Sequence, residues 1–258
     1  MLNNSEYILI KNEKLDNIVF IHDIRNSAKD SFNLFKDLDL DYNYYSFDLP
    51  NHGSSEVDLG RDISIKLILD KVIEFVTTNK IDKIIFILDS MPTLFTKDLE
   101  DHFNSDIKRF ILINPLNRYI KFSSLIYKNA FFTLNKLENL YYEQNMIFNI
   151  KELLNNQEWL NSIHEKRENI WKNEMQFRFL INDIFSWNKI NKYLKKIKKI
   201  NNNYDIILSE NDIFCDYKEN LKLFSNFQAS THILKNTGHD IIWDNKEEYI
   251  NIIKGILK

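Results

Sequence analysis

Three polar residues whose types act together in hydrolysis each follow an apolar run of the kind that forms a strand. Ser90 ends the run IIFILDS, Asp212 follows DIILSEN, and His239 follows HILKNTG. A serine hydroxyl is a poor nucleophile at neutral pH, so it needs a histidine that accepts its proton and a carboxylate that orients that histidine. If the chain brings these side chains together, they could cleave an ester or an amide.

The elements that would position them follow a regular order, in which apolar and β-branched runs alternate with helical patterns. This alternation is typical of α/β proteins with a parallel sheet covered on both faces. The carboxyl ends of parallel strands lie at one edge of the sheet, so polar residues after different strands are expected to meet there. The expected strands are Tyr7–Lys11, Asn17–His22, Asn43–Asp48, Lys83–Leu88, Lys108–Ile113, Tyr204–Leu208 and Thr231–Lys235.

Helices are expected between the strands, and one long segment breaks the pattern. Residues 119–199 hold no convincing strand, many aromatic residues, and the amphipathic stretches Ile147–Leu154 and Trp159–Trp171. We interpret this range as an all-helical insertion, with Tyr193–Asn203 as a polar exit back to the sheet. The other expected helices are Ser27–Leu38, Ile63–Thr78, Pro92–Phe103 and Asn245–Leu257.

Short motifs at the strand ends resemble those of the α/β-hydrolase superfamily over nearly the whole chain. The loop DLPNHGSS (Asp48–Ser55) resembles that family's Asp-x-x-Gly-His-Gly-x-Ser loop, and IHD (Ile21–Asp23) resembles its His-Gly oxyanion motif. SEND (Ser209–Asp212) resembles the Gly-x-x-Asp that supplies the acid, and GHD (Gly238–Asp240) resembles the turn that supplies the histidine. The order Ser, Asp, His along the chain is also that of this family.

The resemblance implies a role for each residue. Ser90 would be the nucleophile, His239 the general base and acid, and Asp212 the carboxylate that orients His239. The backbone N–H groups of Met91 and Ile24 would form the oxyanion hole. The insertion at 119–199 lies where many members of the family carry a lid, so the expected hydrolase core comprises 1–118 and 200–258.

The sequence also departs from the family's pattern, because several of its glycines are replaced. The nucleophile motif Gly-x-Ser-x-Gly here reads Leu88-Asp89-Ser90-Met91-Pro92, in a chain with only 4 glycines. Leu88 must fit where the family has no side chain, whereas a proline near a helix start is tolerated. Asp23 replaces the glycine of the oxyanion motif, and its carboxylate could repel the negative charge that develops there. Such changes are compatible with retained chemistry or with a decayed, non-catalytic relative.

Each candidate residue also has a structural alternative. Ser90 could merely cap a helix, His239 could support a turn, and Asp216 could replace Asp212 as the acid. His22 and His52 fit hydrogen-bonding roles in their loops better than catalysis, and the lone cysteine, Cys215, fits a small buried residue. His102, His164 and His232 are expected to be surface or packing residues. Without a Cys/His cluster or a glycine-rich phosphate loop, the sequence predicts neither a metal nor a cofactor.

Composition narrows the possible partners and the compartment. The chain has 258 residues, a formal net charge of −3 and one cysteine. The charge argues against a nucleic-acid-binding protein, and a single cysteine excludes an intramolecular disulfide framework. With no signal peptide or membrane-spanning run in the sequence, a cytoplasmic protein is expected.

The sequence therefore predicts an α/β protein with a mostly parallel central sheet flanked by helices and an inserted helical lid. The predicted function is hydrolysis of a carboxylic ester, or of a thioester or amide, with an apolar acyl or alkyl group suggested by the aromatic lid. The alternatives are a catalytically inactive hydrolase fold that binds a ligand or protein, and an acyl transferase. The oligomeric state does not follow from the sequence.

Overall fold

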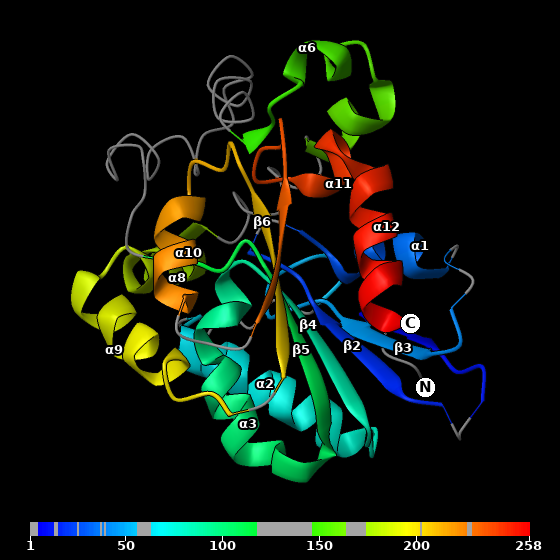
Figure 1. Ribbon diagram of the computed structural model, residues 1–258, viewed down its shortest axis with the longest axis vertical. Coiled ribbons are helices and arrows are strands. Elements are labelled where there is room, and N and C mark those ends of the chain that lie inside the picture. The colour runs from blue at the N-terminus through cyan, green and yellow to red at the C-terminus, as the bar shows by residue number, and fades with distance from the viewer. Residues whose placement is uncertain are drawn as a thin grey trace.

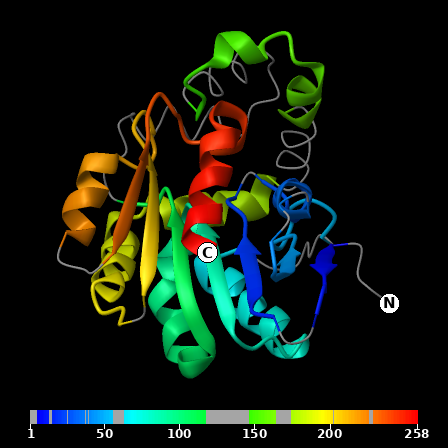
Figure 2. The same ribbon diagram turned by 45° about the vertical axis from the view of Figure 1, so that its right-hand side comes forward.

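A sheet of seven strands forms the centre of the protein and appears as arrows in the ribbon of the computed structural model (Figures 1 and 2). Its strand order is β1-β3-β2-β4-β5-β6-β7. The structure describes residues 5–12, 15–24, 26–36, 38, 40–55, 63–117, 146–163, 174–201, 203–225 and 229–258.

All seven predicted strands are confirmed, each within two residues at either end. Only β1 is antiparallel to its neighbour, and the remaining pairs are parallel. The sheet is therefore mostly parallel, as predicted. The strands are β1 Glu6–Leu9, β2 Asn17–Ile21, β3 Asn43–Phe47, β4 Ile84–Asp89, β5 Ile107–Ile113, β6 Tyr204–Ser209 and β7 Ser230–Leu234.

Both faces of the sheet are covered, which explains why its central strands are apolar throughout. Successive side chains of a strand point to opposite faces, so Leu88 of β4 packs in one core cluster while Ile87 packs in the other. Helices α1 (Ala28–Lys36) and α12 (Lys246–Leu257) contribute to the Ile87 side. Helices α2 (Ile65–Thr78), α3 (Thr96–Phe103) and α9 (Trp187–Ile197) contribute to the Leu88 side (Figure 1).

The remaining helical elements are short or belong to the expected insertion. The predicted helix Pro92–Phe103 is present, but its first turn is the 3₁₀ helix η1, Met91–Phe95, which leads into α3. The others are η2 Asn104–Asp106, α6 Ile150–Leu153, α8 Glu174–Ile184, α10 Tyr217–Phe224 and α11 Ile241–Asp244. No helix within the described ranges combines the length and apolar character that crossing a bilayer requires.

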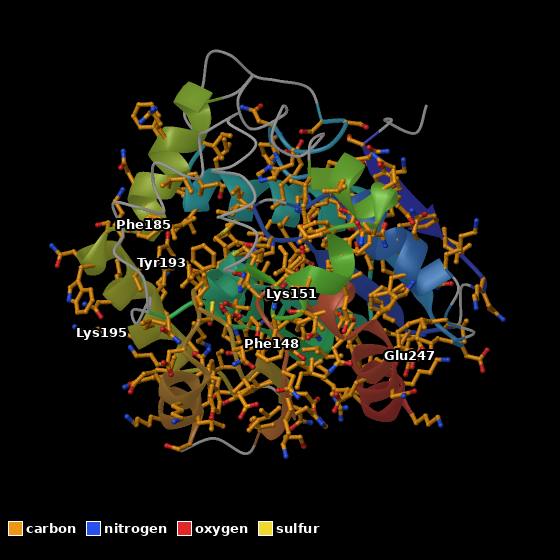
Figure 3. All side chains as sticks on the ribbon, turned by 90° about the horizontal axis from the view of Figure 1, so that it is seen from above. Phe148, Lys151, Phe185, Tyr193, Lys195 and Glu247 are labelled. Carbon is orange, nitrogen blue, oxygen red and sulfur yellow. The ribbon has the colours of Figure 1, made fainter. Side chains whose placement is uncertain are left out.

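Within 119–199 the structure describes residues 146–163 and 174–199, and all the regular structure in them is helical. Trp159 of this segment is buried in the same core cluster as the α9 side chains. Seen from above, Phe148 and Lys151 lie over the middle of the molecule, between Tyr193 on α9 and Glu247 on α12 (Figure 3). Much of the predicted stretch Trp159–Trp171 lies outside the described residues.

One prediction about this segment was wrong. Residues from Tyr193 onward were expected to form a polar exit, but α9 continues to Ile197. The apolar residues Ile190, Leu194 and Ile197 recur at helical spacing and are buried, while the lysines between them cover the outer face. A narrow apolar stripe on a lysine-rich helix is easily mistaken for a polar linker.

Candidate active site

Ser90 lies directly after β4 on a sharp turn with an unusual backbone. Its φ is 60° and its ψ is −107°, a combination that L-residues rarely adopt. The Ser90 N–H donates to Ile113 O on β5 at 2.8 Å, so the turn is bound to the neighbouring strand. Ser90 is the N-cap residue of η1, but its side chain makes no capping hydrogen bond to that helix, so its hydroxyl does not act as the cap.

The turn forms without the glycines found in the resembling family. Leu88 is fully buried in the core cluster on the α2 side, so its side chain is accommodated by packing between the sheet and the helices. Pro92 stands in the first turn of η1, where a missing N–H leaves no helical hydrogen bond unmade. Thr93 adds an anchor, because its side-chain hydroxyl and its N–H both donate to the carbonyl of Ser90.

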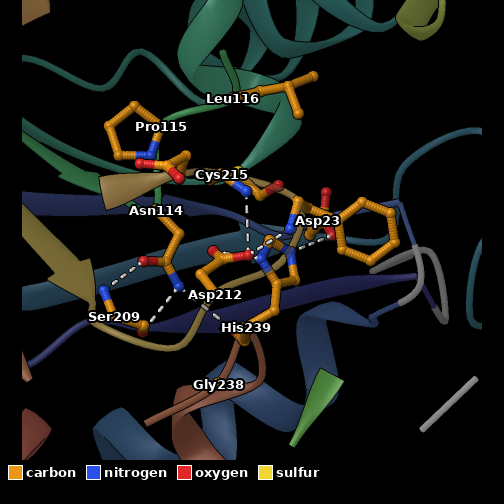
Figure 4. Close-up of polar contacts among 12 residues, drawn as sticks. Asp23, Asn114, Pro115, Leu116, Ser209, Asp212, Cys215, Gly238 and His239 are labelled. Atoms are coloured by element: carbon orange, nitrogen blue, oxygen red, sulfur yellow. Dashed lines mark hydrogen bonds and ion pairs between the residues drawn. The ribbon is translucent and has the colours of Figure 1, made fainter. Parts of the chain in front are cut away.

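His239 and Asp212 form a buried pair at the carboxyl edge of the sheet (Figure 4). His239 Nδ1 donates to Asp212 Oδ2 at 2.7 Å, and Asp212 Oδ1 accepts the N–H groups of Phe214 at 2.7 Å and Cys215 at 3.0 Å. Burial alone lowers the pKa of His239, but the charge and hydrogen bond of Asp212, together with a hydrogen bond to Asp23, outweigh it and hold that pKa well above its usual value. Asp212 therefore fixes the His239 tautomer and favours the imidazolium.

The carboxylate of Asp23 faces His239 from the side opposite Asp212. Asp23 Oδ2 lies 3.4 Å from His239 Nε2, and Asp23 Oδ1 accepts the Met91 N–H at 3.3 Å. The Ile24 N–H also donates to this carboxylate. Although burial raises the pKa of Asp23, these hydrogen bonds and the charge of His239 outweigh that effect and lower it. Figure 4 shows the imidazole held between the two carboxylates.

The loop before His239 is bound to residues that lie far from it in the sequence. Gly238 packs so closely that a Cβ would lie 2.4 Å from the Met146 carbonyl oxygen. The Asp244 carboxylate accepts the N–H groups of Gly238 at 2.7 Å, Phe148 at 2.6 Å and Asn149 at 2.8 Å. The start of α6 and the histidine loop are thereby held together.

The loop after β3 is shaped by its own aspartate. Asp48 accepts the Ala28 N–H and the Ser54 N–H, each at 2.8 Å. Gly53 has a φ of 49°, and a Cβ there would lie 2.3 Å from the Asp48 carboxylate. This position therefore needs glycine both for its backbone conformation and for space.

Comparisons with known proteins agree with this architecture. No protein-family model and no curated protein matches the sequence. Solved structures with a similar backbone include an esterase from Exiguobacterium antarcticum, at 12% sequence identity and a TM-score of 0.76, covering 98% of this chain and 94% of that one. The chain adopts the α/β-hydrolase fold.

Two further solved structures have the α/β-hydrolase fold over nearly their whole length. A meta-cleavage product hydrolase from Pseudomonas fluorescens has 13% identity and a TM-score of 0.78, with 96% of this chain and 91% of that chain covered. MenH from S. aureus has 16% identity and a TM-score of 0.73, with 98% of each chain covered. At such identities the likeness establishes the fold, while the site must be argued from this chain's own residues.

Of the two aspartates proposed as the acid, Asp212 contacts His239 Nδ1, whereas Asp216 has another role in this α/β-hydrolase fold. The Asp216 side chain caps α10 instead, accepting the N–H groups of Lys218 and Glu219. The Ser90 hydroxyl has no hydrogen bond to His239 among the described contacts, since His239 Nε2 faces Asp23. The structure thus pairs two of the three predicted side chains and places the third on the turn after β4.

The remaining histidines with described surroundings are supports. His22 Nε2 accepts the Leu49 N–H at 3.0 Å, and the His52 ring nitrogens lie 2.9 Å from Pro50 O and 2.6 Å from Ile24 O. Burial lowers the pKa of His52 to about 4, so this ring stays neutral and holds the segment that carries the Ile24 N–H. His102 is exposed, His232 lies 4.0 Å from Asp205, and His164 lies outside the described residues.

Asp212, Cys215 and His239 place donor atoms that could bind a metal within 4.8 Å of one another. Both Asp212 oxygens already accept hydrogen bonds, and burial raises the pKa of Cys215 to about 12. A neutral thiol is a poor ligand, since the thiolate is the form that binds metal. The cluster therefore fits a hydrogen-bonded site better than a metal centre.

Sequence reasoning missed several residues that shape the site. Asn114 donates to Ser209 Oγ at 3.0 Å and to His239 O at 3.2 Å, and the only sequence signal was a polar residue directly after a strand. Asp89 lines a cavity of about 20 Å³ together with Asp23, Asp240 and His239. Burial and then the Asp23 charge raise the pKa of Asp89 well above its usual value, so the site favours the protonated form of this carboxyl.

Proposed function

We propose that the protein is a serine hydrolase that cleaves a carboxylic ester, or a thioester or amide, through an acyl-Ser90 intermediate. The single observation that carries this proposal is the backbone of Ser90, with φ 60° and ψ −107° directly after a central strand. Such a conformation costs of order 1–3 kcal/mol, and a residue that only caps the start of a helix ordinarily has an extended backbone instead. The nucleophile elbow of hydrolases needs the strained conformation, because it displays the hydroxyl above the sheet.

The buried pair of His239 and Asp212 supports the general-base role. In the proposed acylation step Ser90 Oγ attacks the acyl carbon, its proton passes to His239 Nε2, and the carbonyl electrons move to the oxygen. Asp212 stabilises the imidazolium formed in this step. The N–H groups of Met91 and Ile24 stabilise the oxyanion, and removal of one such donor typically costs about 2.7–4 kcal/mol.

The second half of the proposed cycle reverses the roles of the same groups. The tetrahedral intermediate collapses, the bond to the alcohol breaks, and the alcohol oxygen takes the proton from His239. Water then attacks the acyl-Ser90 carbonyl while His239 accepts a proton from that water, and the second collapse returns the proton to Ser90 Oγ. Every atom and proton is supplied by substrate, water and these side chains, so the cycle requires no cofactor.

The proposed substrate carries an apolar acyl or alkyl group. The observation behind this proposal is the high aromatic content of residues 119–199, of which Phe148 lies over the middle of the molecule (Figure 3). Nitrophenyl esters of increasing acyl length measure this preference directly. We expect kcat/KM to rise with chain length, and a flat profile contradicts the apolar group.

A catalytically inactive binding protein is the second candidate, and one observation favours it. Asp23 contacts both the Met91 N–H and His239 Nε2, which are the groups that catalysis would use. In that case the Ser90 turn would be inherited structure, and the site would not react with an acylating or phosphonylating reagent.

A fluorophosphonate probe separates the two candidates. We expect the wild-type protein to be labelled on Ser90, and Ser90→Ala and His239→Ala to abolish labelling. Matched controls are the exposed Ser105→Ala and His102→Ala, which should label as the wild type does. Absence of labelling over a broad pH range, in a folded wild-type protein and in a folded Asp23→Ala variant, would favour the binding-protein alternative.

A further inference from the structure

The groups that surround the Asp23 carboxylate define what it does in this site. It accepts the Met91 N–H at 3.3 Å and the Ile24 N–H, and it lies 3.4 Å from His239 Nε2. Two of these are the N–H groups expected to stabilise the oxyanion, and the third is the nitrogen expected to take the serine proton. An anion of the protein itself is thus bound where the reaction would create one.

Hydrolysis cannot proceed while Asp23 occupies these N–H groups and faces His239 Nε2. A backbone N–H that donates to Asp23 is not available to an acyl oxygen, and a carboxylate beside that oxygen would repel its developing charge. A His239 Nε2–H that faces Asp23 also cannot accept the Ser90 proton. The described geometry is therefore a closed state of the site, in which Asp23 stands where the acyl oxygen would bind.

We propose that the Asp23 carboxylate is a built-in occupant of the oxyanion hole, which keeps the site in a resting state until the carbonyl of a substrate displaces it. This proposal rests on the proposed serine-hydrolase function. The position agrees with the motif, since Asp23 stands where the resembling family has a glycine, which has no side chain that could enter the hole.

The charges around Asp23 explain why the resting state is stable. His239 faces it from the loop after β7, and the pKa of His239 is held well above its usual value, so the contact favours the ion pair. The other acidic groups nearby are Asp89 at the end of β4, Asp212 after β6 and Asp240 beside His239. His52 adds no charge because its pKa is lowered to about 4 by burial, and the buried Cys215 is neutral.

The first test measures the contact itself and does not depend on activity. In a Ser90→Ala background, we compare the NMR titration of the His239 ring with and without Asp23→Asn. Removing the carboxylate should lower the pKa of His239, because one of the two anions that stabilise the imidazolium is gone. The exposed Asp106→Asn is the matched control and should leave that titration unchanged. An unchanged titration in Asp23→Asn overturns the proposal.

The second test measures the rate of Ser90 labelling by the fluorophosphonate probe near neutral pH. Asp23→Ala and Asp23→Asn should label faster than the wild type by about tenfold or more, because one unit of pKa corresponds to a factor of ten in the neutral imidazole at a pH below that pKa. Slower or unchanged labelling in both variants overturns the proposal. If no variant labels at all, the serine-hydrolase function fails, while the NMR titration still reports on the Asp23–His239 contact.

The third test uses acetate as a soluble substitute for the side chain. Truncation in Asp23→Ala leaves the donors Met91 N–H, Ile24 N–H and His239 Nε2 facing an empty space that suits a small carboxylate. Added acetate should therefore slow labelling of Asp23→Ala and raise the pKa of its His239, with little effect on the wild type or on Asp23→Asn. If Asp23→Ala labels faster than the wild type but acetate changes neither its labelling rate nor the pKa of its His239, the hole does not bind carboxylates and the proposal is wrong.

Discussion

At the scale of single residues, this site is an arrangement of one imidazole between two carboxylates. Asp212 lies 2.7 Å from His239 Nδ1 and is fully buried, whereas Asp23 lies 3.4 Å from Nε2. The shorter contact belongs to the residue that the chemistry requires on Nδ1, and its oxygens also accept two backbone N–H groups. In the proposed mechanism Asp212 is therefore the positioning carboxylate, and Asp23 is the one that a substrate would displace.

Substitution of Asp212 tests this assignment. Asp212→Asn keeps the size of the side chain and an oxygen for the Phe214 and Cys215 N–H groups, but it removes the charge that fixes the His239 tautomer. We expect the Ser90 labelling rate to fall by a factor on the order of 10⁴, as loss of the corresponding carboxylate does in serine proteases. Asp216→Asn is the control, and equal losses in both variants would contradict the assignment.

At the scale of elements, the turn between β4 and η1 shows how a sharp strand-to-helix turn can form without the glycines of the resembling family. Ser90 is bound to β5 through Ile113 O, and Thr93 binds the Ser90 carbonyl. Leu88 fills the space beneath the turn and is completely buried. The strain at Ser90 is thus held by hydrogen bonds and packing on both sides of the turn.

Leu88→Ala tests the packing beneath the turn. The substitution leaves a cavity in the core, so we expect the free energy of unfolding, measured with urea, to fall by about 2–5 kcal/mol. The labelling rate should also fall, because the turn loses its support. Leu154→Ala, at an exposed position, should change neither quantity, and a Leu88→Ala protein as stable as the wild type would show that Leu88 is not part of the support.

At the scale of the whole molecule, the sheet brings together charges that are far apart in the chain. Asp23 and His239 are 216 residues apart in sequence but meet because β2 and β7 both end at the carboxyl edge. Hydrogen bonds from Asp240 to Met146 O and from Phe148 to Asp244 attach residues 146–148 to the same edge. The stability of the fold should therefore depend on the ionisation of this one cluster.

The free energy of unfolding should fall as the pH rises above neutral. The pKa of His239 is raised in the folded state, so its contribution to stability is fully present below the unfolded value of about 6.5 and is lost as the pH rises through the folded value. The raised pKa of Asp89 acts in the same direction. Urea unfolding from about pH 6 upward should show a falling free energy of unfolding, with a shallower fall in His239→Gln. Equal slopes in the two proteins would contradict this account, and the exposed His102→Gln should retain the wild-type slope.

Much of the architecture could be predicted because its signals are local. Buried parallel strands must be apolar on both faces, so a continuous apolar run such as Ile84–Leu88 predicts a strand from the sequence alone. The order of Ser90, Asp212 and His239 after separate strands predicted their convergence at one edge, and the Asp212–His239 contact agrees with it. The α9 helix was only partly predicted, because its lysines concealed a narrow apolar stripe.

The sequence by itself determined which polar residues follow which strands, and whether most segments are helical or extended. Both features depend on neighbouring residues and on periodicity. Only the tertiary structure decided which atoms meet: Asp23 against the Met91 N–H, Asn114 against the His239 carbonyl, and Asp244 between two loops. These contacts join residues from different strands and loops, and their distances depend on how all the elements pack. A spacing along the chain cannot encode them.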